Sequence, residues 1–281
     1  MEQSPIDNAV ILAAGRIFNQ PGEPAPSSPL TSVGGLSLFQ RTLFTLQRGG
    51  ISRLVVLAGD EMETLKGQIQ GDTRVTADVR WLPIREFSPD DPRTWESISG
   101  MFGGSYLITA TGAVFAASLI ARMAEEARRE DAVVVVRDET MGGPKANGLG
   151  AVREPPLQAR LGLSRTSAGV VTVEEAATLT LDVNLAAIPE GFFASGWATA
   201  HDGPSPLQAA LERGLRQGQV RTLPLRPDWY QSVGAEGPAT RAQAEWTLLK
   251  DSLDGFVGRH FNRPCPQWIT RVLRKIVHFL R

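Results

Sequence analysis

The first apolar run of the chain, Ala9-Val10-Ile11-Leu12, is followed at once by Ala13-Ala14-Gly15. The run is short and contains β-branched residues, which is typical of a parallel-sheet strand buried on both faces. Small residues directly after such a strand let the backbone approach a ligand closely, with amide N–H groups free to face phosphate oxygens. A polar, proline-rich loop and a helical pattern from Leu38 to Leu46 come next. This order of elements predicts the start of a nucleotide-binding α/β domain.

Strand and helix patterns alternate along the rest of the chain, which favours an α/β fold with a mostly parallel sheet. Strands are expected at 51–58, 79–83, 105–109, 131–136, 170–173, 178–186 and 220–225, and helices at 61–69, 95–101, 118–129, 205–217 and 240–250. The chain has 281 residues, enough for one large domain with a filled core. We assign residues 1–250 to this domain.

Composition excludes several classes of function. The formal net charge is −1, so no overall bias points toward nucleic acid as a partner. Cys265 is the single cysteine, which rules out an internal disulfide, suits a reducing compartment and predicts a cytoplasmic location. The three histidines and this cysteine make no zinc spacing. Neither a signal peptide nor a membrane-spanning segment is expected.

Four short segments share one pattern: LAAGR at 12–16, PL at 29–30, VGG at 33–35 and LFQRTL at 38–43. This pattern resembles the nucleotidyltransferases that activate sugar phosphates, and most closely the inositol-1-phosphate cytidylyltransferases. The resemblance implies a single Rossmann-like domain with a mixed, mostly parallel sheet flanked by helices. It also implies that CTP would contact Leu12, Ala13, Ala14, Gly15 and Arg16. Residues 189–193 resemble the family's strand before its last helices.

The chain departs from the family pattern where charge is expected. In the family the loop reads L-A-A-G-x-G-x-R and then P-K-P-L, and two aspartates elsewhere hold a divalent metal. The family arginine falls on Asn19 and the lysine on Ser28, whereas the aspartates fall on Gly112 and, within one residue, on Gly234. Phosphoryl transfer depends chiefly on positioning and on neutralising developing charge. No catalytic residue and no metal ligand is therefore assigned, and Mg²⁺ is expected only if the domain is active.

Two charged residues leave alternatives open. Lys145 lies in the loop TMGGPKANG at 140–148, where it either faces a bound anion or belongs to a surface turn. Asp182 lies in an alternating strand pattern, either as a displaced metal ligand or on the solvated face.

The C-terminal region, residues 251–281, carries a second resemblance. Its segment DGFVGRHFNRP at 254–264 is similar to the junction in fused inositol-phosphate enzymes. There the junction links the cytidylyltransferase domain to a membrane-embedded CDP-alcohol phosphatidyltransferase domain, whose D-G-x-x-A-R motif this chain lacks. From Gln267 onward the pattern is that of an amphipathic helix with Arg271, Arg274, Lys275 and Arg281 largely on its polar side. Such a helix suits an anionic membrane surface, or else it docks on its own domain or on a second copy.

Three hypotheses for function follow. The first is a catalytically degenerate domain that acts as a binding or scaffold module at the inner membrane face in CDP-alcohol phospholipid synthesis. The alternative is an active Mg²⁺-dependent cytidylyltransferase that makes a CDP-alcohol from CTP and an alcohol phosphate. A third is a weak nucleotide sensor that uses residues 13–16.

Overall fold

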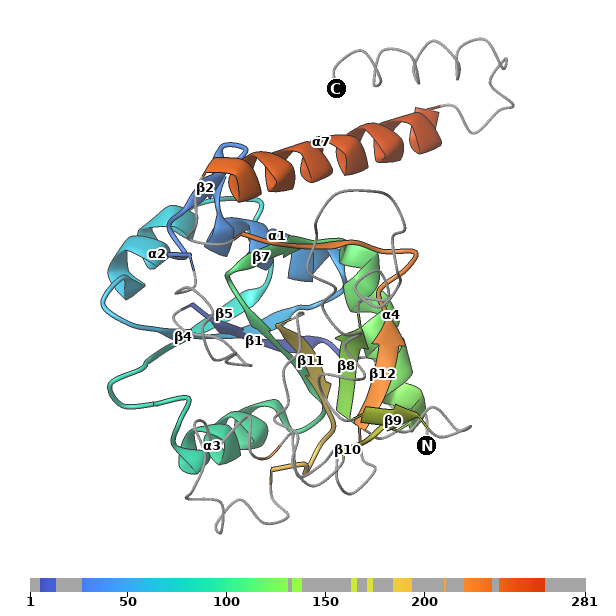
Figure 1. Cartoon of the computed structure of the whole chain (residues 1–281). Coiled ribbons are helices and arrows are strands. Elements are labelled where there is room, and N and C mark those ends of the chain that lie inside the picture. Colours follow the sequence, from blue (N-terminus) through green and yellow to red (C-terminus); the bar gives the residue numbers. More distant parts are fainter. Residues whose placement is uncertain are drawn as a thin grey trace, which may run out of the picture.

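A seven-stranded sheet forms the centre of the molecule (Figure 1). The computed structural model describes residues 6–13, 27–130, 133–137, 163–165, 171–173, 184–193, 210, 220–233 and 238–260. In spatial order the strands are β12 (Val220–Pro224), β8 (Val133–Arg137), β11 (Leu185–Ile188), β6 (Tyr106–Ala110), β1 (Asn8–Leu12), β4 (Arg53–Ala58) and β5 (Asp78–Pro83). Only β11 runs antiparallel to its neighbours β6 and β8. The mixed, mostly parallel sheet expected from the sequence is thereby confirmed.

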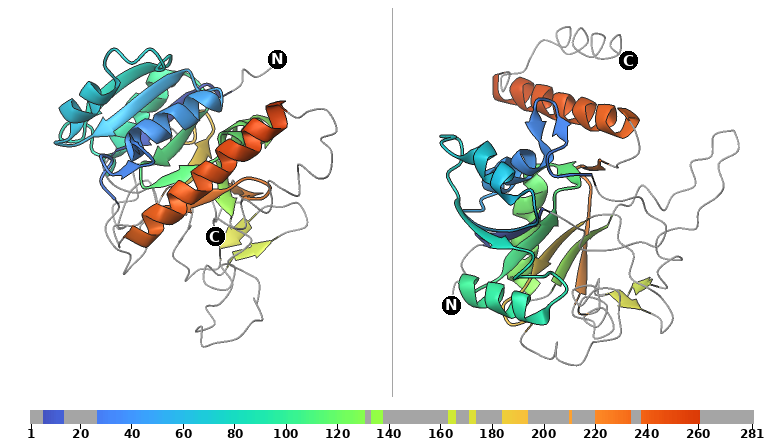
Figure 2. Two further views of the ribbon diagram at one scale, coloured as in Figure 1. Left: turned by 90° about the horizontal axis from the view of Figure 1, so that it is seen from above. Right: turned by 90° about the vertical axis from the view of Figure 1, so that its left-hand side faces the viewer.

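Helices cover both faces of this sheet (Figures 1 and 2). The five described helices are α1 (Leu38–Arg48), α2 (Met62–Ile69), α3 (Pro92–Phe102), α4 (Ala117–Glu130) and α7 (Pro238–His260). One face of the sheet packs on apolar residues of α1, α2 and α4, and the other packs on α3. The result is a three-layer α/β domain, the Rossmann-like architecture expected from the sequence.

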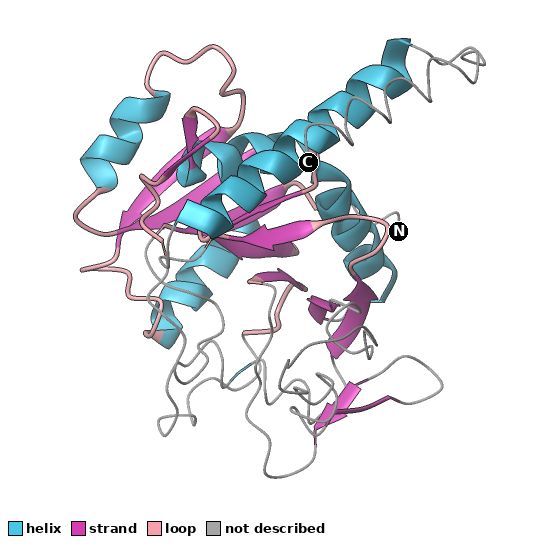
Figure 3. Ribbon diagram, turned by 45° about the horizontal axis from the view of Figure 1, so that its top comes forward, coloured by secondary structure: helices cyan, strands magenta, loops and turns pink. Residues whose placement is uncertain are grey.

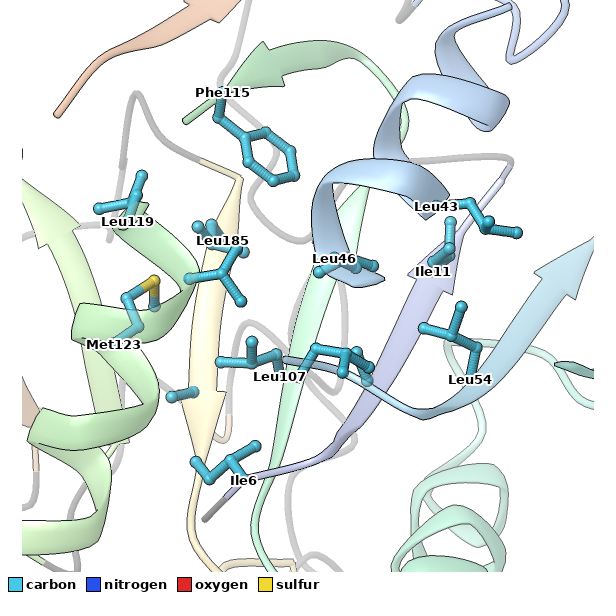
Figure 4. Packing of buried hydrophobic residues seen from close by; sticks show 14 of the residues in the cluster. Ile6, Ile11, Leu43, Leu46, Leu54, Leu107, Phe115, Leu119, Met123 and Leu185 are labelled. Carbon is cyan, nitrogen blue, oxygen red and sulfur yellow. The ribbon is translucent and has the colours of Figure 1, made fainter. Parts of the chain in front are cut away.

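Strand β1 belongs to both halves of the core. All five of its residues are buried, and they alternate between the two faces as the strand period of two requires. Ala9 and Ile11 pack with α1 and α4, whereas Val10 and Leu12 pack with α3. Figure 4 shows the first of these faces, where Ile11, Leu54, Leu107 and Leu185 of the sheet lie close to the apolar side chains of α1 and α4.

Besides the main sheet, the described residues form three two-stranded sheets. The hairpin of β2 (Ser32–Val33) and β3 (Leu36–Ser37) leads directly into α1. Ser37 caps α1 through a reciprocal capping box with Gln40. Strand β7 (Ala113–Phe115) pairs with β13 (Tyr230–Ser232) in antiparallel fashion. The remaining described strands, β9 (Leu163–Arg165) and β10 (Val171–Val173), pair only with each other.

Helix α7 is longer than the sequence pattern indicated. We expected a helix from about Thr240 to Lys250, but it continues to His260 and passes the predicted boundary between residues 250 and 251. No proline interrupts it, because the first proline after Pro238 is Pro264. The predicted division into 1–250 and 251–281 stays a prediction.

Contacts with the hairpin and with β13 hold α7 on the domain (Figure 3). Ala244 is fully buried in a small cluster with Val33, Val114 and Val233. The Gly34 N–H donates to Glu245 Oε1 over 3.0 Å and lowers the pKa of this carboxyl. This contact therefore stabilises the fold above the ordinary pKa of the carboxyl and is lost as the pH falls through the lowered value.

One resemblance is corrected by the structure. Residues 189–193 were expected to form a strand, but the strand in this part of the chain is β11, which ends at Ile188. Pro189 has no N–H to donate to a ladder, and Gly191 adopts a positive φ of 77° in the turn that follows. The predicted helix at 205–217, Lys145 and Asp182 lie outside the described residues. No described helix is long and apolar enough to cross a bilayer.

A substitution at Leu107 tests how much the buried face of the central sheet contributes to stability. Leu107 is fully buried in the cluster shown in Figure 4, so Leu107→Ala leaves a cavity there. We expect a loss of about 2–5 kcal/mol in the free energy of unfolding, measured by urea denaturation. Arg80→Ala, at an exposed position of edge strand β5, is the control and should change it by less than about 0.5 kcal/mol. Equal losses in both variants would contradict this description of the core.

Candidate functional site

The candidate site is the edge of the sheet where the parallel strands end, since ligands of open α/β sheets bind there. Strands β1, β4 and β6 end side by side at this edge, and the antiparallel β11 begins there. The resemblance to cytidylyltransferases places its expected site positions at the end of β1 and in the loop that follows it, after β6, and after β13.

Of the predicted nucleotide-binding residues, Leu12 and Ala13 are described and both are buried. The Ala13 N–H donates to the Leu57 carbonyl oxygen over 2.9 Å, so this amide is not available to a phosphate. The carbonyls of Leu12 and Ala13 accept bonds from the Thr111 N–H (3.3 Å) and the Thr111 hydroxyl (3.4 Å). Ala14, Gly15 and Arg16 lie outside the described residues, so their predicted contact with a nucleotide stays a prediction.

The position of the family lysine has an acidic neighbour. Ser28 Oγ donates to Glu61 Oε1 over 2.9 Å, and it also accepts the Leu30 N–H. Asp60, the residue before Glu61 in the loop after β4, forms an ion pair with Arg85 at 2.8 Å. Both of these side chains are highly exposed. A carboxylate beside Ser28 makes this part of the edge less favourable for a triphosphate than a lysine would.

The two segments that the resemblance assigns to metal binding do meet in the structure. The Val233 N–H donates to the Gly112 carbonyl oxygen over 2.8 Å, next to the pairing of Ser232 with Ala113. Gly234 is outside the described part of the chain, but Val233 is the position within one residue of it. Sequence reasoning therefore selected two segments that lie together.

The side chains at these two positions cannot bind a metal. Glycine has no side-chain oxygen, and Val233 is 2% exposed and packs against Val33 and Ala244. Magnesium requires oxygen ligands in octahedral geometry. Among the residues that the structure describes, no group of three or more His, Cys, Asp or Glu side chains could hold a metal ion. The described residues thus do not fit the Mg²⁺ that the fold family implies, and we derive no step through it.

Among the residues that the structure describes, Asp228 is the carboxylate nearest in sequence to the expected metal aspartate, but it has a structural role. Its side chain is 5% exposed and forms an ion pair with Arg122 of α4, and it also accepts a bond from Ser118. Arg122 additionally donates to the carbonyl oxygens of Pro224 and Leu225. These contacts attach the segment before β13 to α4. Because Arg122 compensates the charge of Asp228, this carboxylate is not a replacement metal ligand.

Two further residues at this edge were not found by sequence reasoning. Ser27 is buried, and its hydroxyl donates to the Val233 carbonyl oxygen over 2.6 Å. The hydroxyl of Tyr230 accepts the Asn184 N–H over 3.1 Å, at the start of β11. A serine in a proline-rich loop carries no signal for a partner 206 positions away. Asn184 reaches the edge only because β11 runs antiparallel, which its short apolar run does not reveal.

The described part of the edge is therefore a backbone framework without the expected charged side chains. No protein-family model matches the chain, and no curated protein sequence matches it either.

Solved structures share its fold at low sequence identity. HddC from Yersinia pseudotuberculosis matches with a TM-score of 0.60 and 12% identity over 86% of this chain and 100% of that protein. A putative glucose-1-phosphate thymidylyltransferase from Bacillus anthracis matches with a TM-score of 0.60 and 12% identity, over 85% and 95% of the two chains. The inositol-1-phosphate CTP transferase from T. maritima matches with a TM-score of 0.52 and 11% identity, over 85% and 92%. The chain thus has the fold of the nucleotidyltransferases.

A substitution at Gly112 tests whether the fold leaves room for the aspartate that the resemblance expects at this position. A Cβ added at Gly112 would meet no heavy atom within 4 Å, whereas one added at Gly49 would come within 2.5 Å of Ile120. We expect Gly112→Asp to change the free energy of unfolding by less than about 1 kcal/mol in urea denaturation. Gly49→Asp is the matched control and should lose about 1–3 kcal/mol or more through overpacking. A loss at Gly112 as large as that at Gly49 would show that the edge is closed to a side chain.

Proposed function

We propose that this chain is a catalytically degenerate nucleotidyltransferase-fold domain, related to the inositol-1-phosphate cytidylyltransferases. It acts as a binding or scaffold module at the cytoplasmic membrane surface in CDP-alcohol phospholipid synthesis. One observation carries the proposal: Gly112 and Val233 are joined through their backbones, as two metal-binding segments should be, but neither supplies a carboxylate. The acidic partner of Ser28 supports it further.

Catalysis by this fold requires charged groups at fixed positions around the phosphates. Removing one preorganised charge contact typically lowers the rate about 10²–10³-fold, and four expected charges are replaced by Asn19, Ser28, Gly112 and a position at or next to Gly234. The backbone framework survives because its hydrogen bonds need no particular side chain at 112 or 233. Selection for a folded surface, rather than for turnover, accounts for both facts.

An active Mg²⁺-dependent cytidylyltransferase is the alternative. It is favoured by the likeness of the fold to an inositol-1-phosphate CTP transferase and by the open space at Gly112, which leaves room for a metal held by other residues. The membrane part of the proposal depends on the basic C-terminal segment, where Arg271, Arg274, Lys275 and Arg281 are predicted to face anionic headgroups.

The catalytic part is tested by calorimetric titration of CTP into the full chain, with and without Mg²⁺. We expect no binding tighter than about 1 mM in either condition, because the described edge supplies neither metal ligands nor a cation at Ser28. Pyrophosphate release from CTP and inositol 1-phosphate should be absent in parallel. Mg²⁺-dependent binding at micromolar strength, followed by pyrophosphate release, would establish the alternative. Metal-independent binding without turnover would instead indicate a nucleotide sensor.

The membrane part is tested by co-sedimentation with vesicles that contain phosphatidylserine. We expect the full chain to bind them, and replacing Arg271, Arg274, Lys275 and Arg281 by Gln should weaken binding by roughly 1 kcal/mol per cation. The control variant replaces the exposed Arg80, Arg85, Arg226 and Lys250 by Gln, which removes the same charge elsewhere. Equal losses in both variants would reduce the effect to net charge and contradict a dedicated surface.

A further inference from the structure

Helix α7 has a second apolar face that points away from the domain. Ala242, Trp246, Leu249 and Leu253 recur at spacings of four, three and four residues along it. At 100° per residue this set lies on the side opposite Ala244, which is fully buried against the domain. We call these four residues the α7 outer seam.

The α7 outer seam contains the exposed large hydrophobic residues of the described structure. Leu249 is 49% exposed and Leu253 is 44% exposed, and both are one turn apart on the same side of the helix. The spacing of four and three is that of a helix that packs against another helix along a shared seam. A helix that needed only to cover the domain would carry polar residues there.

The C-terminal segment carries a matching pattern. Ile269, Leu273, Ile276 and Leu280 follow each other at spacings of four, three and four. Their span of 11 rises is about 17 Å for a helix, and the α7 outer seam, from Ala242 to Leu253, has the same span. The cations of the segment, Arg271, Arg274, Lys275 and Arg281, fall on the other side.

The connection between the two patterns has a suitable length. Residues 261–266 join His260 to Gln267 and include Pro264 and Pro266, and proline is disfavoured in the interior of a helix. Antiparallel neighbouring helices are typically joined by about two to eight residues. Such a short tether gives the segment an effective concentration in the mM range at the seam, so it outcompetes a second copy at micromolar concentration.

We propose that residues 267–281 fold back as a helix and cover the α7 outer seam, so that the two form an antiparallel hairpin on the surface of the domain. The apolar residues of the segment are then buried against α7, and its four cations face outward. The hairpin does not depend on the proposed membrane function. If both hold, the domain meets an anionic surface through cations rather than by inserting an apolar helix face.

Hydrogen exchange of the full chain without vesicles tests the hairpin. We expect the amides of 267–280 to be protected at least about 10-fold relative to an unstructured chain. Leu249→Glu with Leu253→Glu should remove this protection, because charges then occupy the seam. The control, Gln243→Glu with Ser252→Glu, adds the same charge at exposed positions of α7 outside the seam and should keep it.

Crosslinking provides a test that does not rely on weakening the hairpin. In a Cys265→Ser background, Leu253→Cys with Leu273→Cys should form an intramolecular disulfide on mild oxidation. Leu253→Cys with Arg271→Cys, whose second position lies on the cationic side, should form it at least about 10-fold more slowly.

Three results would overturn the proposal. The first is an unprotected 267–280 segment in the wild-type chain. The second is protection that appears only with phosphatidylserine vesicles, which would assign the apolar side to the membrane. The third is protection that rises with protein concentration together with a dimer in sedimentation, which would assign the seam to a second copy. Vesicle binding without a hairpin, or a hairpin without vesicle binding, distinguishes this proposal from the proposed function.

Discussion

The fold depends on central strands that are buried on both faces. Strand β1 directs Ala9 and Ile11 to one core and Val10 and Leu12 to the other, so a change in its register would expose both sets at once. Its parallel neighbours β4 and β6 are aligned with it residue by residue. This alignment brings the ends of all three strands to one edge, and it places the loops after Leu12 and Ala110 close together. The geometry of the candidate site is thus a consequence of core packing.

At that edge the structure separates framework from chemistry. Gly112 and Val233 are connected by backbone atoms, and Ser27 holds the Val233 carbonyl from the opposite side. The Arg122–Asp228 ion pair supports the same segment from α4. None of these contacts requires a metal-binding carboxylate at position 112 or 233. Such a framework keeps its stability without charged side chains at these positions, which is the physical basis of the proposed scaffold role.

Helix α7 lies on the surface of the domain and carries apolar residues on two sides. Its inner side is fixed by Ala244 and by the hydrogen bond from Gly34 to Glu245. Further along the helix, the Trp229 indole N–H donates to Asp251. Burial of apolar residues on its outer side as well needs a further partner, because exposed leucines at a regular helical spacing gain stability only when covered. In the proposed hairpin, the part of α7 beyond Lys250 packs on the C-terminal segment rather than on the core.

The sequence by itself determined the elements and their class. Short β-branched runs such as 9–12 and 53–58 and the helical periodicity of 38–48 reflect burial, and burial is what the order of apolar residues encodes. It also showed that residue 112 has no carboxylate. Only the tertiary structure decided which segments meet: the antiparallel direction of β11, the Ser28–Glu61 contact and the bond between Gly112 and Val233. These depend on register between residues up to 121 positions apart, and periodicity within a segment carries no information about its distant partner.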